Sequence, residues 1–280
     1  MDSKAVDERL PYLLVAEASL LPLIGVVIAG LNKYANPASI TLVVPQHQIV
    51  AFKATVGETA QVISEDTLLP DWPISRVRDR LAYPNRAGWY LQQFLKLSFG
   101  QFAGAPAYVI WDADTVPLAP PLLRDGETTI FCAAKENNSP YFETYKLLLN
   151  QEPALKRSAI AQYMYIETPI VDALQLAIIE KSGAPTWIDA VLDGLPGQSI
   201  SEFSEYETYA NFLISQHEGD GMMIDIPWFR YGSEICPDFT KVTLENLERR
   251  FRRYRFVAFE RHPKSFVRLT AAWALLLLGK

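Results

Sequence analysis

The first 65 residues alternate between short apolar runs and segments with a helical pattern, and this alternation limits the fold more than any other feature. Residues 12–16, 39–44 and 60–64 are the apolar runs, as expected of strands that are covered on both faces. Helices are expected between them, at residues 20–31 and from residue 48 to about residue 56. Strands joined in this way predict a parallel sheet with crossover helices, and therefore an α/β protein.

Residues 11–30 are apolar enough to pass for a membrane span, so this segment needs a separate argument. Glu17 and Pro22 interrupt it, and residues 1–9 are net acidic, whereas a signal peptide needs a basic start. We therefore interpret the segment as a strand, a turn and a buried helix. A membrane span is the alternative.

Composition excludes several classes of protein. With 49% hydrophobic residues, the 280-residue chain can bury a large core, and disorder is not expected. A net charge of −6 argues against a nucleic-acid binder, whose affinity depends on Lys and Arg. Three histidines make zinc chemistry improbable, and Cys132 and Cys236 match no metal or disulfide spacing. Two reduced thiols fit a cytoplasmic protein.

A buried-type strand at residues 107–111 ends at Asp112 and Asp114, and Pro117 follows. Side chains alternate along extended backbone, so both carboxylates are expected to project to the same side just past the strand. Ligands of parallel sheets bind outside the carboxyl ends of the strands, where two carboxylates need a cation. Mg²⁺ or Mn²⁺ carrying a phosphorylated ligand is the predicted partner. Two solvated turn aspartates are the alternative interpretation.

Other polar residues are expected on the same rim. Glu17 follows the first strand, although a turn or cap role would also explain it. Arg86 lies in a polar loop, residues 69–87, that also contains Arg76, Arg78 and Arg80. Guanidinium groups beside a metal site are suited to holding a diphosphate through paired hydrogen bonds. A solvated surface loop is the alternative.

Residues 88–99 are expected to form a helix in which Gln92, Gln93 and Lys96 share one face. Trp89 and its apolar neighbours cover most of the remaining surface, so the helix is buried and its polar stripe faces a partner or a cavity. A buried lysine needs an anion, which makes Lys96 a candidate for binding phosphate. A lysine that reaches solvent along the surface is the alternative. Trp89 is expected to shape the pocket.

Later segments add two candidates. Strands are expected at residues 128–134 and 159–166, the second with Gln162 inside it, and helices at residues 168–183 and around residues 187–192. In residues 203–212, Ser204 and Glu207 have capping-box spacing, which gives Glu207 a structural explanation. Glu205 has none. At a helix N-terminus it stays ionised and suits a base or an acceptor for a sugar hydroxyl.

Three blocks, residues 88–97, 107–115 and 203–209, together resemble a bacterial and fungal family of glycosyltransferase-like domains of unknown function. Their order is also similar to that of nucleotide-sugar-dependent GT-A glycosyltransferases, including the glycogenin and lipopolysaccharide galactosyltransferase group. The resemblance covers roughly residues 10–235. It implies a GT-A fold with a mostly parallel central sheet flanked by helices, and a DxD motif, Asp112 and Asp114, that holds Mn²⁺ or Mg²⁺.

The implied reaction transfers a sugar from a nucleotide-diphosphate donor to a glycan or a lipid-linked acceptor, as in polysaccharide biosynthesis. Glu205 and Asp114 would be catalytic, and Lys96 and Arg86 would neutralise phosphates. The remaining candidates for substrate binding are Trp89, Gln92, Gln93, Glu17, Gln162 and Glu207.

The chain departs from the resemblance at two places. The galactosyltransferase group has a third metal ligand, a histidine near the C-terminus, for which His262 is a faint counterpart. Gln162 stands where family members often carry a histidine. Two alternatives stay open: a catalytically silent domain that binds a nucleotide sugar or a partner, and another nucleotide-dependent transferase. The second usually carries a glycine-rich loop after the first strand, which Ala16-Glu17-Ala18-Ser19 is not.

The last part of the chain differs in character. We expect a catalytic domain at residues 1–238 and a basic and apolar helical extension at residues 239–280. Arginine and lysine outnumber glutamate between residues 245 and 268, and the apolar run that follows is too short to span a bilayer. The extension could rest on an anionic surface at the inner face of the membrane, or dock on the core as a helix.

Overall fold

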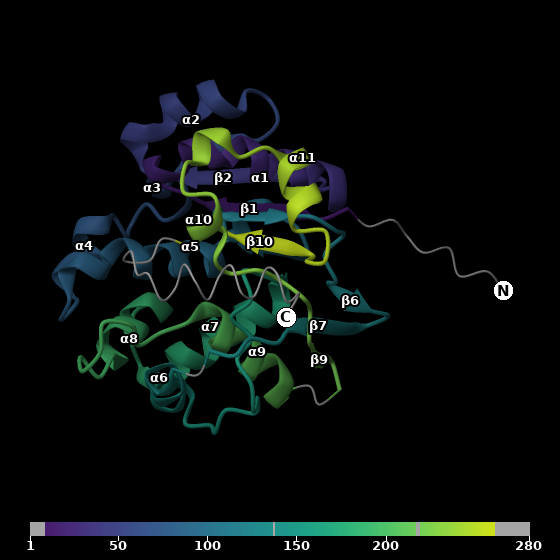
Figure 1. The fold of residues 1–280 in the computed structure, drawn as a ribbon. Helices are drawn as coiled ribbons and strands as arrows, with labels where there is room; N and C mark the ends of the chain where they lie inside the picture. The colour runs from purple at the N-terminus through teal and green to yellow at the C-terminus, as the bar shows by residue number, and fades with distance from the viewer. Residues whose placement is uncertain (1–8, 137, 217–218, 261–280) are drawn as a thin grey trace.

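The computed structural model describes residues 9–136, 138–216 and 219–260. Its central sheet has five strands in the order β3-β2-β1-β4-β8. Figure 1 shows β2 and β1 side by side in this sheet. β1 (Pro11–Val15), β2 (Ser39–Val44), β3 (Gln61–Ser64) and β4 (Ala107–Trp111) are parallel, and β8 (Tyr163–Glu167) is antiparallel to β4. The predicted mixed α/β class, with a mostly parallel sheet flanked by helices, is confirmed.

Both faces of this sheet are covered, because its strands alternate apolar side chains between two clusters. Tyr12 and Leu14 pack with α1 (Leu21–Tyr34) and α2 (Ile49–Val56). Leu13, between them, belongs to the other cluster, which includes side chains of α5, α7, α8 and α9. The bounds of these four helices are Ala87–Ala103, Thr168–Ser182, Trp187–Gly194 and Glu205–Gln216.

Two smaller sheets extend the fold. β6 (Arg124–Asp125), β7 (Thr128–Cys132) and β9 (Gly221–Ile224) form one, and α6 (Ser139–Leu149) follows β7. In the other, β5 pairs antiparallel with β10; these strands span Thr115–Pro117 and Phe256–Ala258. Short helical segments make up the remaining elements: η1 (Ala18–Leu20), η2 (Gln46–Gln48), α3 (Glu65–Leu68), α4 (Ile74–Asp79), η3 (Pro84–Arg86), α10 (Gly232–Ile235), η4 (Phe239–Lys241) and α11 (Leu244–Arg250).

Most predicted elements lie where they were expected, and the exceptions are in connections. Residues 69–87 are not a plain loop, because α4 and η3 interrupt them. Residues 159–162 do not belong to the strand, which starts at Tyr163. Helix α6 was not predicted. Among the described residues, no helix combines the length and the hydrophobicity that crossing a bilayer requires.

Residues 239–260 come from the predicted C-terminal extension. Phe239, Leu247 and Phe251 are buried in the same cluster as α1, and β10 pairs with β5. This part of the extension therefore packs on the core and ends in a strand. Residues 261–280 lie outside the described residues, and the domain boundary at residue 238 stays a prediction.

Candidate functional site

A cavity of about 470 Å³ opens at the carboxyl edge of the parallel strands. Five carboxylates and three cations line it, so we call it the acidic pocket. The charged lining residues are Asp112, Asp114, Glu136, Glu205, Glu260, Arg86, Lys96 and Arg230. Of the predicted site residues, Trp89, Gln92, Gln93 and Gln162 also line it. Segments that are far apart in sequence therefore lie together at the edge of the sheet where the sequence predicted a ligand site.

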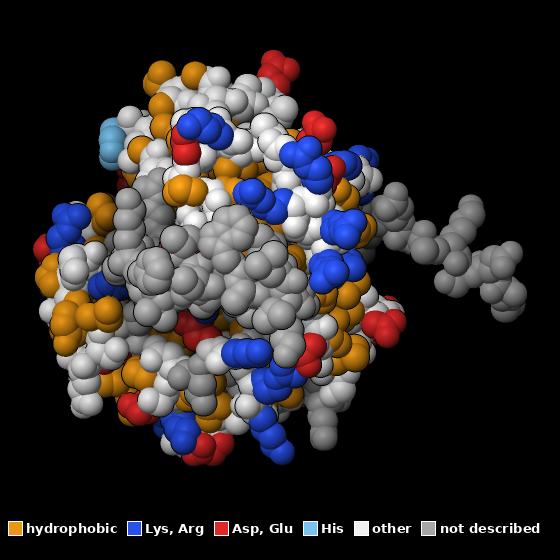
Figure 2. Space-filling view, viewed as in Figure 1, with side chains coloured by type: hydrophobic (Ala, Val, Ile, Leu, Met, Phe, Trp, Pro, Cys, Tyr) orange, Lys and Arg blue, Asp and Glu red, His pale blue; other side chains and the backbone are white. Residues whose placement is uncertain are grey.

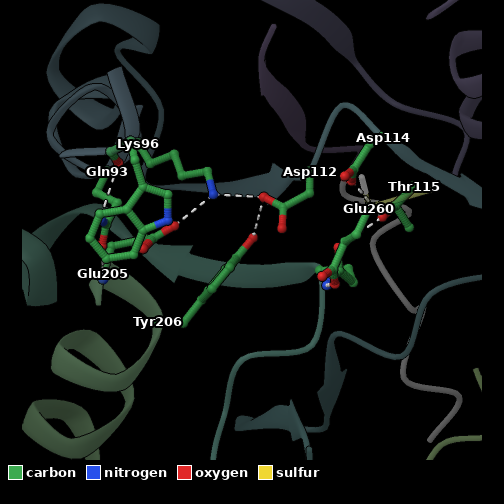
Figure 3. Close-up of polar contacts among 10 residues, drawn as sticks. Gln93, Lys96, Asp112, Asp114, Thr115, Glu205, Tyr206 and Glu260 are labelled. Carbon is green, nitrogen blue, oxygen red and sulfur yellow. Dashed lines mark hydrogen bonds and ion pairs between the residues drawn. The ribbon is translucent and has the colours of Figure 1, made fainter. Parts of the chain in front are cut away.

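Asp112 and Asp114 lie in a turn that links β4 to β5, because the Thr115 N–H donates to the Asp112 carbonyl at 3.0 Å. The prediction of extended backbone here is therefore wrong. Both side chains still line the pocket, but their carboxyl groups face different neighbours (Figure 3). Two long-range backbone bonds fix the turn: the Asp112 N–H donates to the Gln162 carbonyl, and the Phe259 N–H donates to the Asp114 carbonyl, each at 2.8 Å.

Lys96 joins two acidic side chains, as Figure 3 shows. Its Nζ lies 2.6 Å from Asp112 Oδ1 and 2.6 Å from Glu205 Oε1, and its side chain is only 5% exposed. Burial disfavours the ammonium, but the two carboxylates outweigh this effect and raise the pKa of Lys96. Burial raises the pKa of Glu205, and Lys96 opposes that rise. The predicted anion partner of Lys96 is thus a pair of protein carboxylates.

Tyr206 completes this arrangement. Its hydroxyl donates to Asp112 Oδ1 at 3.0 Å, and Lys96 Nζ lies 4.7 Å from the centre of its ring. Both protein donors therefore use the same oxygen of Asp112. Asp112 Oδ2 accepts no hydrogen bond from any described residue, which leaves it available to a cation.

Asp114 has few favourable neighbours. Its carboxylate accepts from the Thr115 hydroxyl at 3.2 Å and makes no ion pair with a described residue. Burial, together with the charges of Asp112 and Glu260, raises the pKa of Asp114 to about 7. A divalent cation would offset this concentration of negative charge. The donor set fits Mg²⁺ or Mn²⁺, which take carboxylate oxygens.

The described residues contain no group of three or more His, Cys, Asp or Glu side chains arranged to hold a metal. His262, considered as a third ligand, lies outside the described residues. Two carboxylates are nevertheless sufficient for a cation that takes its remaining ligands from substrate phosphates and water.

Gln162 connects the turn to the C-terminal part of the pocket. Its backbone has a φ of +71°, which is rare for a residue with a side chain, and it is 4% exposed. The Thr115 hydroxyl donates to Gln162 Oε1 at 3.1 Å, and Gln162 Nε2 donates to Glu260 Oε1 at 2.8 Å. Arg230 then links Glu260 to Glu136, at 3.0 and 2.9 Å. Gln162 therefore positions other pocket residues.

The residues predicted on α5 divide into two groups. Gln93 is structural, since its Oε1 accepts from the Glu205 N–H at 3.0 Å and so supports the start of α9. Gln92 lines the pocket and makes no hydrogen bond to the described residues through its side chain. Trp89 lies between the Arg86 guanidinium, 4.5 Å from its ring centre, and the ring of Tyr141, at 6.3 Å. Trp89 and Tyr141 both line the acidic pocket.

Two predicted residues lie outside the pocket lining. Glu17 is exposed and accepts from the Ser19 hydroxyl at 2.7 Å. Glu207 is buried, and its carboxylate accepts from the Ala159 N–H at 3.3 Å. The Glu207 N–H donates to Ser204 Oγ at 3.3 Å, as a capping box requires. The Glu207 carboxylate, however, accepts from the neighbouring loop.

Sequence analysis missed five lining residues with charged or aromatic side chains: Glu136, Tyr141, Tyr206, Arg230 and Glu260. Glu136 follows a predicted strand, and Tyr206 adjoins Glu205, so both had a local signal. Arg230 and Glu260 lie far along the chain, in segments without any motif.

The fold and the pocket define an α/β protein with an acidic pocket at the carboxyl edge of its sheet. The chain belongs to a family of unknown function, DUF6492, whose model matches residues 17–225. No curated protein matches it significantly. Among solved structures it is similar to mouse xyloside xylosyltransferase 1 in its apo form, with 12% identity and a TM-score of 0.48. That match covers 90% of this chain and 97% of the mouse chain.

Proposed function

We propose that the protein is a metal-dependent glycosyltransferase that uses a nucleotide-diphosphate sugar. The observation that supports this most directly is the acidic turn, where Asp112 offers a free oxygen and Asp114 has no cation partner among the described residues. Bound Mn²⁺ or Mg²⁺ would neutralise the donor's diphosphate and stabilise it as a leaving group. The acceptor would be a glycan or a lipid-linked sugar.

The other residues then have distinct roles. Lys96 orients Asp112 and Glu205 by binding both carboxylates. Trp89 lines the part of the pocket where the donor would bind, and Arg86 lies next to it for the phosphates. Glu205 accepts a hydrogen bond from a hydroxyl of the donor or acceptor sugar. It acts as the base if the reaction inverts configuration.

A test compares Asp114→Asn with wild type in Mn²⁺ titration calorimetry and in hydrolysis of UDP-, GDP- and CMP-sugars. Wild type should hydrolyse one donor only with metal, and the variant should lose about 100-fold in that rate. Glu58→Gln, at an exposed position in the turn after α2, is the control and should behave as wild type. Unchanged Mn²⁺-dependent hydrolysis in Asp114→Asn would refute the metal assignment. Metal-dependent donor binding without any turnover would favour the silent binding domain.

The membrane contact remains a second proposal of narrower scope. Arg249, Arg250, Arg252 and Arg253 are all exposed on or just after α11, where basic side chains attract anionic lipid. We expect the chain to sediment with vesicles that contain phosphatidylglycerol and not with pure phosphatidylcholine vesicles. Equal sedimentation with both kinds of vesicle would contradict the proposal that this is a cytoplasmic protein held at an anionic membrane surface.

A further inference from the structure

A second cavity, of about 640 Å³, adjoins the acidic pocket. We call it the basic pocket, because its charged lining consists of Lys135, Lys146, Lys156, Arg157, Glu136 and Glu152. Glu136 lines both cavities. Figure 2 shows several Lys and Arg side chains on the lower part of the molecule, with Asp and Glu side chains between them. The two cavities are therefore neighbours of opposite charge.

The cations of the basic pocket are only partly neutralised. Lys146 pairs with Glu152 at 2.6 Å, and Arg157 pairs with Asp225, whose pKa is lowered by Arg157 and by the nearby Lys135. Lys156 is exposed and makes no ion pair with a described residue. Glu136 is bound by Arg230 from the side of the acidic pocket. The basic pocket thus keeps a surplus of positive charge, which an anion would compensate.

Helix α9 fixes the two cavities relative to each other. Its first turn places Glu205 and Tyr206 in the acidic pocket. From the same helix, Glu207 accepts from the Ala159 N–H, and Asn211 Oδ1 accepts from the Leu155 N–H at 2.8 Å. These two bonds hold the loop that carries Lys156 and Arg157. The distance between the two charged regions is therefore fixed, and a ligand that spans both cavities has to match it.

We infer that the basic pocket binds an oxyanion, a phosphate or a carboxylate, carried by the acceptor. This inference rests on the proposed function. An acceptor hydroxyl has to reach Glu205 in the acidic pocket, where surplus negative charge repels any anionic group of the same molecule. The neighbouring cavity supplies the opposite charge, so it selects acceptors whose anionic group lies a short distance from the reacting hydroxyl.

The experiment measures binding of glucose 6-phosphate, glucuronate and glucose by ligand-observed NMR, at low and at high salt. At least one anion should bind, glucose should not, and binding should weaken as salt rises. The two anions distinguish a phosphate from a carboxylate. In the double variant Lys135→Ala/Lys156→Ala, affinity should fall about tenfold. Lys53→Ala, an exposed lysine on α2, is the matched control and should bind as wild type does.

Two outcomes would overturn the inference: neither anion binds, or an anion binds the double variant as tightly as wild type. The proposed function fails separately, since it is tested by metal-dependent donor hydrolysis in the wild-type protein. Absence of hydrolysis together with lysine-dependent anion binding would contradict the transferase and leave the anion site intact.

Discussion

The acidic and basic pockets share a wall and a supporting helix, yet they hold their charges in different ways. In the acidic pocket, Lys96 is buried and its ammonium is fixed between two carboxylates. In the basic pocket, Lys146 and Lys156 are exposed. Buried ion pairs are costly to break, whereas exposed charges are weakly coupled and screened by salt. The first pocket is therefore suited to holding a fixed geometry, and the second to attracting a ligand.

Removing the buried ammonium group of Lys96 should reduce the stability of the folded protein more than any other change considered. Lys96→Met leaves Glu205, whose side chain is 5% exposed, without its ion-pair partner. We expect a loss of about 3–5 kcal/mol in the free energy of unfolding, measured with urea. Lys53→Met, at an exposed position, should change it by less than about 0.5 kcal/mol. A loss below about 1 kcal/mol for Lys96→Met would remove the contrast between the pockets.

The pH dependence of Glu207 tests the supporting helix α9, which holds the loop of the basic pocket. Burial raises the pKa of Glu207 to about 6 from 4.5, so the folded protein binds this proton more tightly than the unfolded chain does. The stability that this proton confers is full below about pH 4.5 and is lost as pH rises through about 6, in total up to ~2 kcal/mol. The difference in the free energy of unfolding between wild type and Glu207→Gln, measured between pH 4 and 8, should show this pH dependence. With exposed Glu180→Gln as the control, the wild-type slope should persist.

The backbone of Gln162 provides a test of rigidity in the acidic pocket. Because its φ is +71°, glycine should be tolerated there better than alanine, by up to about 1 kcal/mol in urea unfolding. Both variants lose the contacts to Thr115 and Glu260, so their difference isolates the backbone. At Thr41, in the middle of β2, the usual order should hold, with alanine the more stable. The same order at both positions would argue against strain at Gln162.

The basic pocket should show the smallest effect on stability. The side chains of Lys146 and Glu152 are 47% and 80% exposed, so their ion pair is largely screened. Lys146→Ala should change the free energy of unfolding by less than about 0.5 kcal/mol. A loss comparable with that of Lys96→Met would mean that the basic pocket is as rigid as the acidic one.

The sequence predicted the parts of the molecule that depend on local pattern. The strands β1 to β4 follow from runs of apolar residues, and the buried polar stripe of α5 follows from helical spacing. Lys96 was correctly expected to be buried beside an anion, but the sequence could not show that this anion consists of Asp112 and Glu205.

The parts that were missed depend on distant contacts. The direction of β8 is set by the path of the chain, and its apolar pattern is the same in either direction. Arg230 and Glu260 reach the pocket because β10 pairs with β5, a contact across more than one hundred residues. The positive φ of Gln162 has no signal in sequence, since glutamine is not among the residues that favour it.

The bond from the Phe259 N–H to the Asp114 carbonyl has a consequence for biosynthesis. Strands β1 to β4 lie within the first 111 residues, so a growing polypeptide contains all the parallel strands of the central sheet once β4 has left the ribosome. The aspartate turn, however, gains this tie and the neighbouring β10 strand only after residue 259 has emerged. A nascent chain therefore contains the four parallel strands well before the backbone of the aspartate turn can be fixed in its final geometry.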